Sequence, residues 1–304
     1  MSLHLSHMEV LSTHEAERQT TSFRLNFFHE ATVGNGYGQA DGQFINPTDV
    51  KICLDHHLVL VCDSGNKRVQ AFDLFTREFK YKIDLPDAPR CLAIDPKDDS
   101  LLITCENCIY KYDLHTHQQV WILGPNQDEH NKFENLKGVV VEEGSGNIYV
   151  SDNRIKVLSR NGQVIKTIGV EGKGPMQFNH PHGICFNDRD GFLIVSDVQN
   201  NRVQIISKNG DDFIYMFGKK GISSSDFLYP TGIIVDKPTG NILVCDTSNH
   251  RIQVFSSRGE FIKSFGNKGS NHQEFSSPTG ICINSRNGEL YVADSMNHRV
   301  QIYK

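Results

Sequence analysis

Short runs of β-branched and aromatic residues recur along the chain, and each is bounded by Gly, Asn, Asp or Pro. In one well-marked stretch the runs fall at about 231–236, 241–246, 251–256 and 261–265. Asn209-Gly210 and Arg258-Gly259 supply the positive-φ positions that tight β-hairpins require. We find no segment with apolar residues at helical spacing over three turns. The pattern predicts an all-β protein made of four-stranded units.

The unit repeats, most clearly in the C-terminal half. Each good copy opens with Pro-Thr/His-Gly-Ile, and its second apolar run ends in an Asp that is followed five residues later by an Arg. Clear copies begin at Pro181, Pro230 and Pro278, another strong copy surrounds Asp63, and a partial copy with a shortened turn surrounds Asp152. A degenerate copy lies between these two. Units of roughly 40 to 45 residues are typical of β-propeller blades.

The last unit stops one strand short, at Tyr303-Lys304. The segment Phe28-His-Glu-Ala-Thr-Val-Gly34 resembles the fourth strand of other units, so we expect residues 23–34 to close the last blade as its outer strand and to remove an exposed sheet edge. The fold class is thus a six-bladed β-propeller within one domain, 23–304, preceded by a mobile N-terminal extension, 1–22. The predicted blades span about 44–84, 85–124, 133–169, 178–218, 227–266 and 275–304.

Composition narrows the classes of function. The formal net charge is −5, and the turns and inter-blade loops carry no positive excess, which argues against a general nucleic-acid surface. Several of the eight cysteines recur at equivalent repeat positions, which favours small buried hydrophobes over disulfides or metal ligands. The sequence has no apolar stretch of the roughly 18 residues that a membrane span needs, and its amino end is polar. We expect a cytoplasmic monomer.

The string Asp-x-x-Asn-His/Asn-Arg-Val/Ile-Gln, preceded by Pro-Thr/His-Gly-Ile and followed by Gly-x-Lys-Gly, resembles the NHL repeat. The resemblance implies a six-bladed propeller that acts as a recognition module. Some members of that family are joined to RING and B-box ubiquitin-ligase segments, and some bind single-stranded RNA. Relatives of similar shape are metal-dependent lactonases or an amidating lyase. A shared fold does not settle function, so the sites need a separate argument.

In four units an Asp lies before the turn that follows the second strand, and an Arg lies after this turn, five residues later. An Arg fork at this distance can satisfy both a buried carboxylate and the carbonyls of a loop. We interpret these pairs as structural locks, and partner binding is the alternative. The pairs are Asp63 with Arg68, Asp197 with Arg202, Asp246 with Arg251, and Asp294 with Arg299.

A second set of candidate residues consists of the residue at the start of each innermost strand, beside the central channel. Its members are Thr48, Arg90, Lys137, His182, Thr231 and Thr279. Three adjacent units therefore carry basic or titratable groups, and we call Arg90, Lys137 and His182 the basic arc. The arc would bind a carboxylate, a phosphate or an acidic peptide, more tightly once His182 is protonated below about pH 6.5. The alternative is a solvated surface without function.

These observations predict a non-catalytic scaffold that binds a protein, an acidic peptide or an acidic ligand on the propeller face and at the channel mouth. We predict no catalytic residue, metal or cofactor, because the histidines are scattered and neither a nucleophile elbow nor a phosphate-binding Gly loop occurs. Binding of single-stranded RNA stays open as an alternative, although the charge disfavours it. A metal-dependent hydrolase or lyase of the propeller type is the second alternative.

Overall fold

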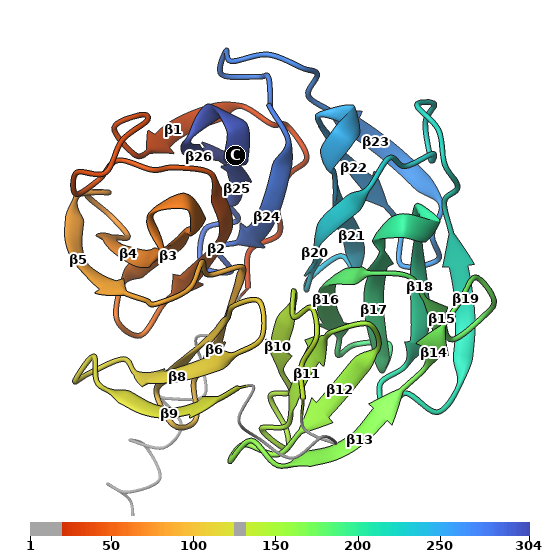
Figure 1. The fold of residues 1–304 in the computed structure, drawn as a ribbon. Helices are drawn as coiled ribbons and strands as arrows, with labels where there is room; N and C mark the ends of the chain where they lie inside the picture. Colours follow the sequence, from red (N-terminus) through yellow and green to blue (C-terminus); the bar gives the residue numbers. More distant parts are fainter. Residues whose placement is uncertain (1–19, 125–131) are drawn as a thin grey trace, which may run out of the picture.

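The four apolar runs of each unit form one antiparallel sheet, and six such sheets surround a central axis in the computed structural model (Figure 1). The structure describes residues 20–124 and 132–304. The middle strand β3 (Leu58–Asp63) is buried along its whole length because both of its faces pack against neighbouring sheets. In the outer strand β5 (Phe79–Asp84), half-buried or buried residues alternate with exposed ones. The predicted all-β class and six-bladed propeller are confirmed.

Blades are numbered in chain order, and their strands run from the channel outwards. Blade 1 contains β2 (Pro47–Cys53), β3, β4 (Arg68–Asp73) and β5. Blade 2 contains β6 (Cys91–Asp95), β7 (Ser100–Thr104), β8 (Ile109–Asp113) and β9 (Gln119–Leu123). Blade 3 contains β10 (Val139–Val141), β11 (Ile148–Ser151), β12 (Ile155–Leu158) and β13 (Val164–Ile168).

The other half of the ring is more regular. Blade 4 contains β16 (Pro181–Asn187), β17 (Phe192–Asp197), β18 (Arg202–Ser207) and β19 (Phe213–Phe217). Blade 5 contains β20 (Pro230–Asp236), β21 (Asn241–Asp246), β22 (Arg251–Phe255) and β23 (Phe261–Phe265). A small parallel pair, β14 (Val170–Glu171) and β15 (Gln177–Phe178), joins blades 3 and 4.

Blade 6 is built from two distant parts of the chain. Its strands are β24 (Pro278–Ile283), β25 (Leu290–Asp294), β26 (Arg299–Tyr303) and, outermost, β1 (His29–Val33). β1 pairs antiparallel with β26, and Phe27 beside it is buried, with its ring 4.3 Å from that of Phe265. The Thr21 N–H donates to the Ser285 carbonyl at 2.7 Å. Residues 1–19 of the expected extension lie outside the described residues.

The start of each inner strand and the turn after each second strand lie on one face, the upper face, because β16 and its equivalents pair Pro181 with Asp197. In blades 1, 4, 5 and 6 this turn is a short 3-10 helix: η1 (Ser64–Asn66), η3 (Val198–Asn200), η4 (Thr247–Asn249) and η5 (Ser295–Asn297). Across the described residues, no helix has the length and apolar character to cross a bilayer. All eight cysteines are buried and free.

Candidate binding channel and upper face

Each of the four predicted Asp–Arg pairs is joined on the upper face. In blade 4, Arg202 Nε donates to Asp197 Oδ2 at 2.8 Å, and its Nη atoms donate to carbonyls of the preceding loop, including that of Gln177. Gln204 and Asn200 also donate to Asp197 Oδ2. The corresponding Nε–Oδ2 distances are 2.7 Å for Arg68–Asp63, 2.7 Å for Arg251–Asp246 and 2.8 Å for Arg299–Asp294.

In these networks the hydrogen-bonding groups of the paired Asp and Arg side chains are already occupied. Asp197 is completely buried, and its Oδ1 accepts the N–H of Asn179 at 2.7 Å, so both carboxylate oxygens are satisfied. The Arg side chain ties the loop between two blades to the turn. The arrangement supports the interpretation of the pairs as structural locks, since the carboxylate oxygens already accept hydrogen bonds from within the protein.

The basic arc lies where the inner strands of blades 2, 3 and 4 begin. The guanidinium of Arg90 lies 3.8 Å from Glu106, and its Nε is buried without a hydrogen-bond partner in the described part of the chain. Lys137 forms no ion pair with any residue that the structure describes. Burial, with the nearby Arg90 charge, lowers the pKa of Lys137 to about 8.

The pKa of His182 argues against its expected role as a proton-sensitive part of the arc. His182 lines the channel, and burial, together with the charges of Lys137, Arg90 and Lys51, lowers its pKa to about 3. His182 is therefore neutral across the physiological range, and its Nδ1 is buried without a hydrogen-bond partner among the described residues. It can contribute a neutral hydrogen-bonding group, but no charge.

The three threonines of the set link blades. Thr48 Oγ1 donates to the Pro89 carbonyl at 3.2 Å, and Thr231 Oγ1 donates to the Thr279 carbonyl at 3.1 Å. Each of these carbonyls belongs to the start of the next blade's inner strand. Thr279 Oγ1 lies 3.5 Å from the Pro47 carbonyl and links blade 6 to blade 1 in the same way, whereas Lys137 of the basic arc has no ion-pair partner among the described residues.

An ion pair inside the channel was missed by the sequence analysis. Asp49 is 3% exposed, and both of its carboxylate oxygens lie 2.9 Å from Lys51 Nζ. Its Oδ2 also accepts the Leu92 N–H at 2.9 Å. Burial alone would lower the pKa of Lys51, but the Asp49 charge outweighs it and raises the pKa. The available signal was that blade 1 has Asp49 where blades 3 to 6 have Gly.

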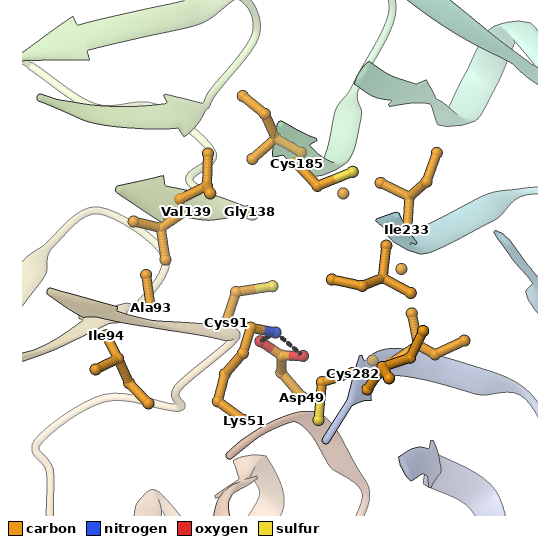
Figure 2. A pocket seen from close by; sticks show the side chains of 18 of the residues that line it. Asp49, Lys51, Cys91, Ala93, Ile94, Gly138, Val139, Cys185, Ile233 and Cys282 are labelled. Atoms are coloured by element: carbon orange, nitrogen blue, oxygen red, sulfur yellow. Dashed lines mark hydrogen bonds and ion pairs between the residues drawn. The ribbon is translucent and has the colours of Figure 1, made fainter. Parts of the chain in front are cut away.

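Beside His182, the channel forms a cavity of about 310 Å³, and the lining residues Cys91 and Gly138 directly follow Arg90 and Lys137 in the chain. Figure 2 shows side chains from all six blades around the opening, with the Asp49–Lys51 pair at one side of it. The wall is otherwise mostly apolar, with Ile94, Val140 and Ile234 among its residues. Burial raises the pKa of the lining thiols Cys185 and Cys282 to about 12, so they are poor nucleophiles. Within 20–124 and 132–304, no cluster of three or more His, Cys, Asp or Glu is placed to hold a metal ion.

The ring of six sheets around a lined channel defines a six-bladed β-propeller protein. The model of the family described as "NHL repeat" matches three of its blades, at residues 178–206, 227–255 and 275–303. Together with the six-bladed ring, these matches make this an NHL-repeat β-propeller protein.

Solved structures share the fold at low sequence identity. A structural genomics protein of unknown function from Bacteroides thetaiotaomicron is 15% identical, with a TM-score of 0.72 over 90% of this chain and 74% of that one. An auxiliary nutrient binding protein from the same organism is 13% identical, with a TM-score of 0.69 over 94% and 74%. A streptogramin B lyase structure is 17% identical, with a TM-score of 0.61 over 93% and 89%. These likenesses concern the fold alone.

A curated relative is the peptidylglycine alpha-amidating monooxygenase of Rattus norvegicus. The two are 30% identical over an alignment of 119 positions, and the match covers 35% of this chain. The match spans 12% of the rat protein.

Proposed function

We propose that this protein is a non-catalytic, cytoplasmic binding scaffold that recognises an acidic segment of a partner protein at the upper mouth of its channel. The observation that carries the proposal is the pair of cations Arg90 and Lys137. They begin neighbouring inner strands, and Lys137 has no carboxylate within ion-pair distance in the described structure. Each of the four repeated arginines of the turn locks, in contrast, is committed to an internal Asp.

The state of Lys137 supports binding of an anion. Burial and the Arg90 charge both work against its ammonium form, so a carboxylate placed between the two cations would relieve their repulsion. Such a ligand would raise the pKa of Lys137 and be held by charge-assisted hydrogen bonds. Affinity is then expected to fall as the pH rises through about 8, because free Lys137 loses its proton there.

The rest of the upper face suits a protein better than RNA. Ile222 and Met296 lie in upper-face loops and are 78% and 54% exposed, and Tyr37 is 68% exposed against the ring of His298. Exposed aromatic and Met side chains are common in protein interfaces. The chain as a whole carries a net charge of −5, which does not favour a polyanion.

The test is the affinity of a fluorescent peptide with a run of Asp and Glu, measured by anisotropy at several salt concentrations. Arg90→Ser with Lys137→Ser should weaken binding about tenfold or more while the melting temperature stays close to that of the wild type. Lys219→Ser with Lys220→Ser is the matched control, because it removes the same charge from an exposed upper-face loop. Equal losses in both variants would mean that only the overall charge matters.

The Lys137→Arg variant separates the site from general electrostatics. An Arg stays charged at pH 9, so this variant should keep its affinity where the wild type loses it. A labelled single-stranded RNA is tested alongside. If the RNA binds with strong salt dependence and the acidic peptide does not bind, the protein-partner proposal is wrong.

A further inference from the structure

The channel near the basic arc differs from the upper face in character, because most of its wall is apolar. Its volume of about 310 Å³ lies at the lower end of the range for small-molecule pockets. Ile94, Val140 and Ile234 contribute to the wall from three different blades. Such a cavity is suited to a compact apolar group and offers little to a peptide backbone.

Charges inside the channel are already balanced. Asp49 neutralises Lys51, as Figure 2 shows. At the opposite end from the arc, Lys237 forms an ion pair with Glu143, and this contact joins blades 5 and 3 across blade 4. A ligand's charge would find no free partner in either place. The body of the ligand should therefore be uncharged.

The upper end has the opposite property. Arg90 and Lys137 carry two positive charges, and Glu106, the one acid within ion-pair distance of either among the described residues, is 67% exposed. One positive charge is thus in surplus. Two buried nitrogens at this end, Arg90 Nε and His182 Nδ1, also lack a hydrogen-bond partner in the described structure. Buried polar atoms without partners are rare and call for an explanation.

We propose that the channel binds a small monocarboxylic acid with a compact apolar body. Its carboxylate would lie at the upper end between Arg90 and Lys137, with His182 within reach, and its body would fill the space between Ile94, Val140 and Ile234. A carboxylate matches the planar guanidinium, and its single negative charge matches the single surplus positive charge. The proposal deepens the proposed function and rests on it for its use of the arc: the acid and the acidic partner would compete there.

The probe is 3-phenylpropionate, followed by NMR of the protein labelled with carbon-13 in its isoleucine methyl groups. We expect the methyl resonances of Ile94 and Ile234 to shift on titration. Two control compounds separate the parts of the ligand. 3-Phenylpropan-1-ol keeps the body without the carboxylate, and acetate keeps the carboxylate without the body, so each should bind at least about tenfold more weakly.

Two variants locate the site. Arg90→Ser with Lys137→Ser removes the partners of the ligand's carboxylate. Ala93→Leu places a larger side chain in the channel wall and leaves both cations unchanged. Both should abolish the shifts, whereas only the first should affect the acidic peptide. If Ala93→Leu does not fold, Ile234→Phe takes its place.

The outcomes are distinguishable. If the channel methyls do not respond to 3-phenylpropionate while the peptide still binds through Arg90 and Lys137, the channel proposal is wrong and the proposed function stands. If the alcohol binds as well as the acid, the cavity recognises apolar bodies without the arc, which also overturns the proposal. If 3-phenylpropionate shifts the channel methyls of the wild-type protein but the acidic peptide does not bind, the proposed function is wrong instead.

Discussion

The Nδ1 atom of His250 accepts a hydrogen bond from the backbone N–H of Ser277 at 3.0 Å. His250 ends the turn of blade 5, and Ser277 immediately precedes the inner strand of blade 6. His298 makes the same contact with Asn46 at 3.2 Å and so joins blade 6 to blade 1. A backbone N–H can only donate, so each imidazole must be neutral at Nδ1. The repeated His is a connector between blades.

These contacts predict a loss of stability in mild acid. Burial and the charge of Lys268 lower the pKa of His250 below its usual 6.5. The folded state therefore favours the neutral ring, and its stabilising effect is complete above about pH 6.5 and is lost as the pH falls towards the lower folded-state pKa. Loss of the His250–Ser277 contact should cost about 1 kcal/mol. Thermal melts between pH 5 and 8 measure the effect.

The chain provides its own control. Asn201 occupies the same turn position in blade 4, and its Oδ1 accepts the Tyr229 N–H at 3.0 Å without titrating. His250→Asn should thus melt like the wild type at pH 8 and lose less stability at pH 5. Parallel pH profiles for the variant and the wild type would show that protonation of His250 does not control stability in this range.

Arg251 should be structural, with no direct part in binding. Besides Asp246 it donates to the carbonyls of Ile222, Ser223 and Asp226. Arg251→Ala leaves these acceptors unpaired and should cost about 1–3 kcal/mol in the free energy of unfolding. Arg258→Ala, at an exposed position, is the control and should be neutral. An unchanged melting temperature combined with lost peptide binding would reverse the assignment.

Repetition made much of this molecule predictable. Four copies of the Asp–Arg spacing gave the turn locks, and three copies of Pro-Thr/His-Gly-Ile gave the inner strands. Features that occur once could not be found in this way. The Asp49–Lys51 pair has no counterpart in another blade, and the Glu143–Lys237 pair joins blades that are not neighbours. The pKa of His182 depends on enclosure by the whole ring, which no local pattern reports.

Phe27 should anchor the amino-terminal part of the chain to blade 6. Its side chain is 1% exposed and contacts the rings of Phe23, Phe265 and Tyr303. Phe27→Ala should destabilise the protein by about 3–5 kcal/mol, whereas Phe28→Ala changes a side chain that is 68% exposed and should have little effect. Denaturant titration measures both. Similar losses for the two variants would contradict the anchoring role.

Removing the closing strand should have a different result from weakening its anchor. Without residues 1–34, β26 loses its partner β1 and presents an open edge, so we expect aggregation. Deletion of residues 1–22 should leave the protein nearly as stable as the full chain, since β1 and Phe27 stay in place. Light scattering compares the two. A monomeric, well-folded protein lacking 1–34 would contradict closure by β1.

The ring itself depends on glycines where neighbouring inner strands meet. A Cβ atom on Gly232 would lie 2.1 Å from the Thr279 carbonyl oxygen and 3.2 Å from the Cα of Gly280, and both are backbone atoms that cannot turn away. Gly232→Ala must therefore push blades 5 and 6 apart and should cost about 1–3 kcal/mol. Gly144→Ala is the control, because nothing lies within 4 Å of its Cβ position. It should be neutral or stabilising by up to about 1 kcal/mol, through the lower entropy of the unfolded chain. Equal melting temperatures for the two variants would mean that the inner strands are not held this closely in solution.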